Sequence, residues 1–320
     1  MSGIERIPVS TPFGIGPVNC YFLPGDRPVL IDPGPATEAA YATLEERLTA
    51  AGCDIADIHD VLVTHEHMDH FGVIRRIKDQ SGARVHAHEQ AVEVLADHAC
   101  HFEHEREFFD PYLRSMGVPD RVATAATELP EPYLAFQEPV TVDNVLSEGD
   151  SIALDPTIEV VHTPGHSPGS VCFYAPDGEW LLTGDHLLTD ITPNPAMTVQ
   201  PGRPTKRFRA LPQYVDSLRA LTSYDSVVGP GGHRDPVSDV RTRALEVIDH
   251  HESRADNIVS LLEAEGPLSA YEIMGDLFSD LPVTEVFLGM SEVIGHLDLL
   301  EDAARIENVP DGDIVRFQAT

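Results

Sequence analysis

A cluster of metal-binding residue types, the segment 64–70 with the sequence THEHMDH, constrains this chain more than any other feature. It follows a short apolar stretch at 60–64 that predicts a β-strand. If the backbone stays extended beyond that strand, His65 and His67 project to the same side and can share one metal ion. Asp69 and His70 lie where the chain turns into a predicted helix and can address a second ion. A solvated histidine-rich loop is the alternative, but imidazoles packed beside carboxylates have few structural uses.

Three later segments carry one further candidate ligand each: His166 in HTPGHSPG, Asp185 in TGDH and His233 in GGH. Each segment comes directly after a predicted strand. The glycines and prolines around the candidates predict tight loops, which hold a ligand in place while the backbone approaches the metal closely. Each signal is weak alone, but the four segments in this order strongly indicate a metal centre.

The rest of the first 236 residues reads as short strands and amphipathic helices. Strands are predicted at 7–11, 20–23, 28–32, 84–87, 151–154, 158–162, 170–174, 179–183 and 226–228, and helices at 37–50, 71–80, 89–96 and 205–222. Between 98 and 139 the pattern changes, because aromatic residues mix with charges and end in the proline-rich LPEPYLAFQEP. This change predicts an inserted helical lid followed by a loop.

After residue 236 the pattern shifts to helices, predicted at 239–265, from 270 onward and at 284–302. A capping box of Ser269 and Glu272 opens the second of them. A strand–turn–strand pattern over 305–318 ends the chain. Three helices and a hairpin predict a small winged-helix-like domain over 237–320, behind a catalytic domain over 1–236 that includes the 98–139 lid.

The four ligand segments, taken together, resemble the metallo-β-lactamase superfamily over roughly residues 5–236. The resemblance implies an α/β fold, a four-layer αββα sandwich with metals at one edge of its paired sheets. It also implies a ligand set for two divalent ions: His65, His67 and His166 for one ion, Asp69, His70 and His233 for the other, and Asp185 as the bridge.

Two further positions are expected to support these ligands. Asp32 ends the predicted strand VLID and matches an aspartate of the superfamily that orients the ligands, although a plain turn carboxylate is the alternative. His162 and His186 lie close to proposed ligands in the sequence. We expect both to orient or pack against the metal site rather than bind metal.

The ligand set predicts a dinuclear metal hydrolase in which a metal-bridging hydroxide attacks a carbonyl or a phosphorus atom. Asp69 is expected to act as a catalytic residue that holds this nucleophile and receives its proton. Nitrogen and carboxylate ligands favour zinc, and iron or manganese also fits. Asp185 stands where antibiotic-degrading zinc β-lactamases commonly carry a cysteine. The site therefore looks like the glyoxalase-type, lactonase and nuclease branches, and β-lactam cleavage is not expected.

The charge of the chain bears on the substrate. Asp and Glu number 53 against 21 Lys and Arg, which gives a net charge of −32 spread along the whole sequence. An overall acidic surface is typical of a salt-adapted, halophilic cytoplasm, and an ordinary acidic enzyme is the alternative. Nucleic-acid binding needs basic residues, yet the predicted helix 284–302 has none, and only Arg305 and Arg316 follow Gly266.

We therefore favour a hydrolase of a small ester, thioester or lactone as the function. An endoribonuclease or phosphodiesterase remains the alternative, because the domain order resembles that of the β-lactamase-like endoribonucleases. Without a basic face, the carboxy-terminal domain is interpreted as a packing or dimerisation module, so the expected partners are a small-molecule substrate and a second copy in a homodimer. Nucleic acid is a less favoured partner.

Several remaining features have two interpretations. The basic cluster Arg203, Lys206, Arg207 and Arg209 either lies near the site or forms an exposed helix start. His98, His101 and His104 form either a third metal site or, by preference, a polar helix face. His250 and His251 are expected at the surface. The four cysteines are expected to be buried thiols in a reducing compartment. No apolar run approaches the length of a membrane span, so no membrane partner is expected and a cytoplasmic protein is predicted.

Overall fold

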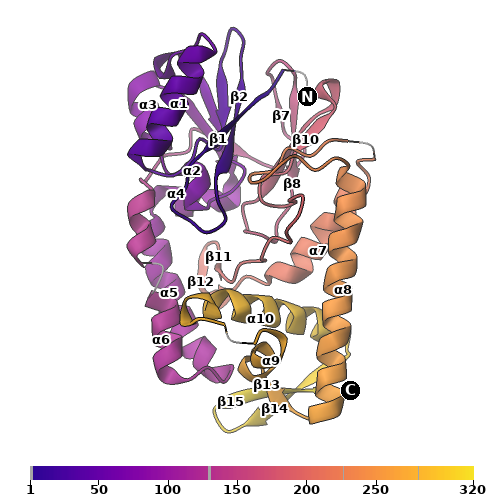
Figure 1. Ribbon diagram of the computed structural model, residues 1–320. Coiled ribbons are helices and arrows are strands. Elements are labelled where there is room, and N and C mark those ends of the chain that lie inside the picture. Colours follow the sequence, from indigo (N-terminus) through magenta and orange to yellow (C-terminus); the bar gives the residue numbers. More distant parts are fainter. Residues whose placement is uncertain (1–2, 129–130, 226, 280) are drawn as a thin grey trace.

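Figure 1 shows the computed structural model, which describes residues 3–128, 131–225, 227–279 and 281–320. A six-stranded sheet runs in chain order from β1 to β6. Its first three strands are antiparallel, and β3 to β6 are parallel. The strands are β1 (Glu5–Val9), β2 (Val18–Leu23), β3 (Val29–Ile31), β4 (Asp60–Leu62), β5 (Arg84–His88) and β6 (Asn144–Leu146).

A second sheet of four antiparallel strands, in the order β10-β9-β8-β7, lies against the first. It comprises β7 (Ser151–Ile152), β8 (Ile158–His162), β9 (Val171–Ala175) and β10 (Trp180–Leu182). A single parallel bridge joins Trp180 to Val228, in the predicted strand 226–228. Ser226 lies outside the described residues.

Side chains that alternate along each strand build three apolar layers. Cys20 and Phe22 of β2 pack with helices α1 (Glu38–Ala50) and α3 (Ile74–Ser81), whereas Tyr21 and Leu23 face the second sheet. The far side of the second sheet packs on α7 (Ala210–Leu221) and α8 (Val240–Glu265). Because successive side chains of a strand point to opposite faces, each sheet is covered on both sides. The predicted four-layer αββα sandwich is confirmed.

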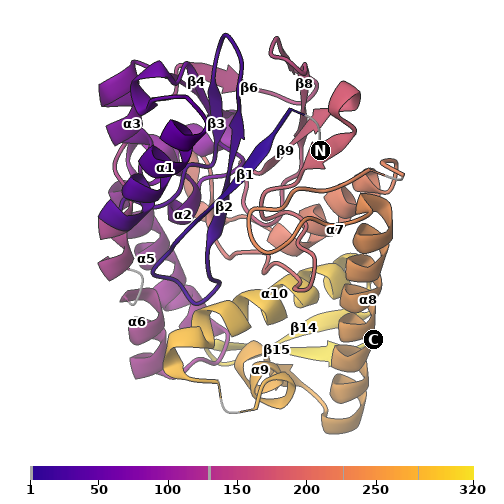
Figure 2. The same ribbon diagram turned by 45° about the horizontal axis from the view of Figure 1, so that its top comes forward.

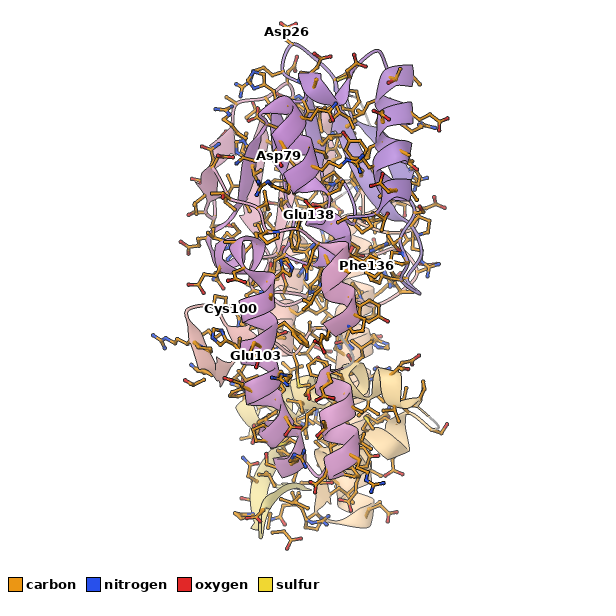
Figure 3. All side chains as sticks on the ribbon, turned by 90° about the vertical axis from the view of Figure 1, so that its left-hand side faces the viewer. Asp26, Asp79, Cys100, Glu103, Phe136 and Glu138 are labelled. Carbon is orange, nitrogen blue, oxygen red and sulfur yellow. The ribbon has the colours of Figure 1, made fainter. Side chains whose placement is uncertain are left out.

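The inserted segment 98–139 is helical, as predicted, with α5 (His98–Ser115), α6 (Asp120–Glu128) and the 3-10 turn η3 (Glu131–Phe136). It is more than a lid over the catalytic domain. Phe109, Leu113 and Ala123 share one apolar core with Ile258 and Met290 of the carboxy-terminal part. Figures 1 and 3 show this helical hairpin running down one side of the molecule, where it supports the carboxy-terminal elements.

The carboxy-terminal part has the order helix, strand, helix, helix and hairpin. The elements after α8 are β13 (Leu268–Ser269), α9 (Ala270–Leu277), η5 (Val283–Glu285), α10 (Val286–Asp302), β14 (Ile306–Asp311) and β15 (Ile314–Ala319). The three strands form a sheet in the order β13-β15-β14. The capping box of Ser269 and Glu272 is present. The winged-helix assignment and the domain boundary between residues 236 and 237 remain proposals. Helix α8 contributes both to the core under the second sheet and to the core of the carboxy-terminal part, so the cores do not separate at that boundary.

Several predictions of local structure are wrong. The helix predicted at 205–222 begins as strand β12 (Arg203–Arg207), which pairs with β11 (Val199–Gln200), and α7 begins only at Ala210. The helix predicted at 71–80 is split into α2 (Met68–Phe71) and α3, and the predicted helix at 89–96 begins as the 3-10 turn η2 (Glu89–Ala91) before α4 (Val92–Ala96). Short 3-10 turns η1 (Ile55–Asp57) and η4 (Pro176–Gly178) complete the elements.

Two predictions of burial are also wrong. Cys100 is exposed on α5 (Figure 3), while Cys20, Cys53 and Cys172 are buried as expected. His251 is buried where α8 meets α10, and its Nδ1 lies 3.2 Å from Nε2 of His296. None of the helices in the described ranges combines the length and apolarity that a membrane crossing requires.

Candidate metal centre

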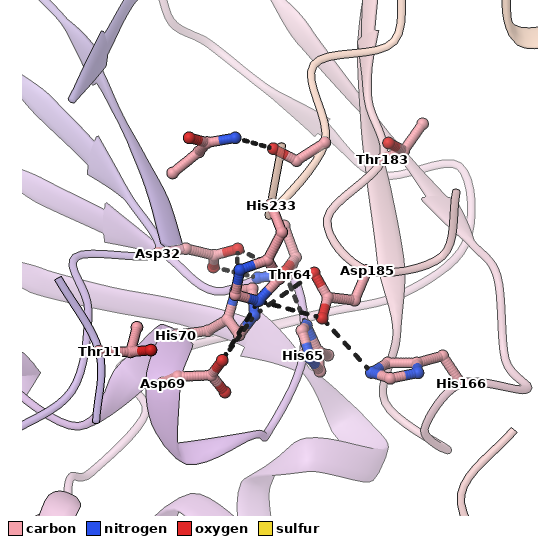
Figure 4. A network of polar contacts seen from close by, with 12 residues as sticks. Thr11, Asp32, Thr64, His65, Asp69, His70, His166, Thr183, Asp185 and His233 are labelled. Carbon is pink, nitrogen blue, oxygen red and sulfur yellow. Dashed lines mark hydrogen bonds and ion pairs between the residues drawn. The ribbon is translucent and has the colours of Figure 1, made fainter. Parts of the chain in front are cut away.

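The seven predicted ligand residues meet at one edge of the two sheets, where four loops converge. Figure 4 labels six of them: His65, Asp69, His70, His166, Asp185 and His233. His65 and His67 lie in the loop after β4, and Asp69 and His70 lie on α2, which begins at Met68. The remaining three come from loops after β8, after β10 and between α7 and α8: His166, Asp185 and His233.

The ligand atoms form two groups, each within 4.8 Å internally: His65 with His67 and His166, and Asp69 with His70 and His233. Asp185 lies between these groups. Its Oδ1 is 3.5 Å from Nε2 of His70, and its Oδ2 is 3.8 Å from Nε2 of His166 and 3.5 Å from Nε2 of His233. Its two oxygens thus face both groups, which is the placement that a bridging carboxylate requires.

Four of the imidazole rings are held by Nδ1, so that Nε2 points into the centre. Each Nδ1 is within hydrogen-bond distance of a protein oxygen: Thr64 Oγ1 for His65 (2.9 Å), Asp32 Oδ2 for His70 (2.9 Å), the Asn194 carbonyl for His166 (2.9 Å) and the Pro17 carbonyl for His233 (2.8 Å). All four Nε2 atoms are buried, and none has a hydrogen-bond partner among the residues that the structure describes. A buried polar atom without a partner costs about 1–3 kcal/mol, so the arrangement fits bound cations.

Asp32 is the support for one side of this centre. Its carboxylate accepts hydrogen bonds from the Thr64 amide (2.8 Å), the Thr64 hydroxyl (2.5 Å) and Nδ1 of His70 (2.9 Å). Since the Thr64 hydroxyl donates to Asp32, its oxygen is free to accept from Nδ1 of His65. Asp32 therefore contacts His70 directly and His65 through Thr64, as expected of a residue that orients ligands. It lies directly after β3 and has a left-handed backbone (φ 52°). The turn-carboxylate alternative does not account for these contacts.

Replacing Asp32 with asparagine is expected to weaken metal binding about 10–100-fold, because the ring of His70 loses its charged acceptor. Asparagine tolerates the left-handed backbone and keeps the shape of the side chain. Competition with a chromophoric chelator would measure the affinity. Unchanged metal affinity in the D32N variant would show that Asp32 does not act on the ligands.

Burial and the neighbouring charges set the protonation of the cluster without metal. Burial lowers the pKa of His67 to about 3 and holds the pKa of His65 well below its usual value. Burial alone would raise the pKa of Asp185, but the adjacent His70 and His233 outweigh it and lower that pKa. Neutral imidazoles and ionised carboxylates are the forms that bind metal ions. His65, His67 and Asp185 are therefore already in that form. The neighbouring carboxylates outweigh burial and raise the pKa of His70 and of His233, so these two rings must release a proton when metal binds.

The loop that carries His233 approaches the centre closely because residue 232 is glycine. A β-carbon at Gly232 would collide with Oδ1 of Asp185 and with the ring of His70. The glycine also joins this loop to its neighbours, since its amide donates to the Gly184 carbonyl (2.7 Å). At this position glycine lets the backbone approach the ligands closely, as predicted for the ligand loops.

The histidines near the ligands have packing roles. The ring of His162 stacks on His88 with centroids 3.8 Å apart, and its Nε2 lies 3.0 Å from the Pro168 carbonyl, within the loop that carries His166. His186 is buried against Tyr214. Neither belongs to a group of candidate metal ligands in the described part of the chain.

The histidines on α5 were interpreted as a polar helix face, but this describes them only in part. His98 is buried, and both His98 and His101 line a cavity beside the metal centre. Nε2 of His101 lies 3.3 Å from Glu105. Among the described residues, neither histidine belongs to a third group of candidate ligands on this helix.

The basic cluster does not line the metal centre, and of its four members only Arg209 stands at a helix start, as the N-cap residue of α7. The cluster lies on and just after β12, and two of its arginines form ion pairs with α10 instead of reaching the site. Arg207 pairs with Asp298 at 2.6 Å, and Arg209 pairs with Asp302 at 2.9 Å. These arginines join the catalytic part of the chain to the carboxy-terminal part.

Sequence reasoning missed Glu66, which lies between two candidate ligands in the chain. Its carboxylate is buried and accepts hydrogen bonds from the Ser167 hydroxyl (2.9 Å) and the Gly169 amide (3.2 Å). It therefore joins the histidine cluster to the loop that carries His166. The sequence did contain a signal for this role. In an extended segment successive side chains point to opposite sides, so Glu66 points away from the side shared by His65 and His67.

An αββα sandwich with a histidine–aspartate cluster at the edge of its sheets defines a metal-dependent hydrolase. The chain belongs to the metallo-β-lactamase superfamily, whose sequence profile matches residues 13–233. This confirms the resemblance that the ligand segments indicated. The chain is an enzyme of the metallo-hydrolase type that this superfamily comprises.

Similar proteins extend the likeness to the whole chain. The probable metallo-hydrolase YqjP of Bacillus subtilis (strain 168) is 30% identical over 315 residues, covering 98% of this chain and 97% of that protein. A metallo-β-lactamase family protein of Thermus thermophilus has a structure with TM-score 0.83 and 27% identity, covering 100% of this chain and 99% of that one. A β-lactamase domain protein of Burkholderia ambifaria shares the fold, with TM-score 0.83, 23% identity and coverage of 100% and 93%.

Proposed function

We propose that this protein is a dinuclear metal-dependent hydrolase of a small ester, thioester or lactone. The observation that carries the proposal is the set of four buried Nε2 atoms that lack a hydrogen-bond partner in the described part of the chain, three of them 3.5–3.8 Å from the carboxylate of Asp185. His65, His67 and His166 would hold one ion, and Asp69, His70 and His233 the other. Divalent ions bound here lower the pKa of water and polarise the oxygen of the electrophile. These donors suit zinc, and iron or manganese also fits them.

Asp69 is proposed as the catalytic residue that handles the proton. Its Oδ2 lies 3.2 Å from Nε2 of His233, and 14% of its side chain is exposed, so a water molecule can reach it. Burial would raise its pKa, but His70 and His233 outweigh burial and the pKa is lowered. Asp69 is therefore an ionised acceptor that can orient the attacking water and receive its proton.

The contacts of the carboxy-terminal part disfavour the endoribonuclease alternative. Helix α10, which corresponds to the predicted helix 284–302, packs against α7, α8 and α9, and both views of the ribbon show it crossing the middle of the molecule (Figures 1 and 2). Most of its side chains are buried, so it is not free to enter a groove of nucleic acid. Arg305 pairs with Asp256 at 2.8 Å and Arg316 with Glu272 at 2.7 Å. A small substrate is therefore favoured.

Metal analysis tests the proposal directly. We expect elemental analysis of the purified protein to find two ions per chain, and chelation to abolish hydrolysis that metal addition restores. Thioester, lactone, phosphodiester and RNA substrates should be assayed side by side at low and high salt. One ion per chain at full activity would contradict the dinuclear mechanism, and RNA cleavage with inert esters and lactones would reverse the choice of substrate class.

A further inference from the structure

A cavity of about 440 Å³ opens beside His67 and His166. Its volume is within the range of small-molecule binding sites. Its walls are mainly apolar and come from the catalytic part, from α5, from η3 and from α10: Met68, Val94, Phe102, Leu134, Met197 and Leu288. A group bound there would lie directly next to the metal centre.

The charge of this cavity restricts what it can hold. Its described lining includes no lysine or arginine, and its two carboxylates already have partners. Glu66 accepts from Ser167 and Gly169, and Glu105 lies 3.3 Å from Nε2 of His101. An anionic group would lose its hydration beside two carboxylates, and the positive charge that His101 could offer is already paired with Glu105, so its binding is costly. The cavity therefore suits an uncharged, apolar group. A substrate that carries free carboxylates, such as a thioester of an acidic peptide, suits it less well.

Helix α10 builds one wall of the cavity and also supports a candidate ligand. The Leu288 carbonyl accepts from Nδ2 of Asn194 (3.0 Å), whose own carbonyl lies 2.9 Å from Nδ1 of His166. The Ser291 hydroxyl donates to the Pro195 carbonyl (2.6 Å) and accepts from the Met197 amide (2.8 Å). The carboxy-terminal part therefore holds the segment 194–197 in place and contributes Leu288, which is 51% exposed, to the cavity.

We propose that this cavity binds the uncharged acyl chain of the substrate, and that Leu288 of the carboxy-terminal part is a specificity-determining residue for the length of that chain. The inference rests on the proposed function, since the reacting carbonyl must lie at the metal centre while the acyl chain extends between α5 and α10. It assigns the substrates to neutral acyl esters or lactones with an apolar tail.

The first test compares p-nitrophenyl acetate, butyrate, hexanoate and octanoate on the metal-loaded full-length protein. Each methylene that enters the cavity is expected to raise kcat/KM about fourfold. The monoester of adipic acid, similar in length to hexanoate but anionic, is expected to react at least about tenfold more slowly. The same activity towards all four neutral esters would overturn the inference.

Leu288→Ala is expected to lower kcat/KM for the octanoate ester about tenfold and to leave the acetate ester within about twofold. Leu245→Ala is the matched control, because Leu245 is a leucine of similar exposure (49%) on α8 outside the cavity. That variant should behave as the unmodified protein with every ester. Equal chain-length profiles for the two variants would overturn the role of Leu288.

A binding measurement separates this inference from the proposed reaction. Isothermal titration calorimetry with octanamide, a neutral probe, should show binding that weakens about tenfold in Leu288→Ala and not in Leu245→Ala. Leu288-dependent octanamide binding without any ester hydrolysis would support the cavity and refute the reaction. Metal-dependent hydrolysis without such binding or chain-length preference would refute the cavity and support the reaction. Absence of both would overturn both.

Discussion

Replacing Asp185 with alanine is expected to lower kcat/KM for metal-dependent hydrolysis by about a thousandfold or more. This carboxylate faces both groups of candidate ligands, with oxygens 3.5 Å from His70, 3.5 Å from His233 and 3.8 Å from His166. Its loss removes the one group shared by both proposed ions and part of the negative charge beside the imidazoles. A metal centre contributes several kcal/mol to transition-state stabilisation, which converts to a loss of this size.

The measurement is steady-state hydrolysis of the best ester, together with elemental analysis of the same preparation. Asp190→Ala is the control, since Asp190 is an exposed aspartate in the same loop region, and it should retain activity and two ions. Thermal unfolding of both variants would show whether the fold persists. Asp185→Ala with two ions and full activity would disprove the assignment of the site.

Asp298→Ala is expected to lower the free energy of unfolding by about 3–5 kcal/mol. Asp298 lies on α10, its side chain is 4% exposed, and both of its oxygens bond Arg207 at 2.6 and 2.7 Å. Arg207 is itself largely buried on β12. Removing the carboxylate would leave a buried guanidinium without its counter-charge, between the catalytic and carboxy-terminal parts.

The neighbouring pair supplies a matched comparison. Asp302 also lies on α10 and pairs with Arg209 at 2.9 Å, but its side chain is 52% exposed. Asp302→Ala should therefore cost about 1 kcal/mol or less. Urea denaturation of both variants, at the same salt concentration, measures the difference. Equal losses would show that burial of the Asp298 pair does not determine its contribution.

The sequence was most informative where structure is local. Each candidate ligand follows its strand within a few residues, so the strand pattern alone placed His65, His166 and Asp185 at strand ends. The start of α1 was equally local: the helix was predicted from residue 37, and the Thr37 side chain caps it by accepting from the Ala40 amide. Such features depend on neighbours along the chain, and periodicity and cap residues report them directly.

Contacts between distant segments were not predictable. The segment 203–207 has no alternation of apolar residues, and it becomes a strand because it pairs with β11. His251 was expected at the surface, but α10 crosses α8 at that position and buries it. Leu288 carried no signal as a cavity residue, because its place depends on how α10 lies against residues 194–197. These outcomes are set by tertiary packing, which overrides local pattern.

Helix α8 runs without a break from Val240 to Glu265, and its two ends belong to different cores. Val240 and Ala244 pack under the second sheet, whereas Ile258 and Leu262 pack with α10. A continuous helix resists bending, because bending must disrupt its backbone hydrogen bonds. Because α10 packs on α8, we expect Leu288 to stay at a constant distance from the catalytic part, so that the proposed cavity would select acyl chains by a fixed width instead of closing around them.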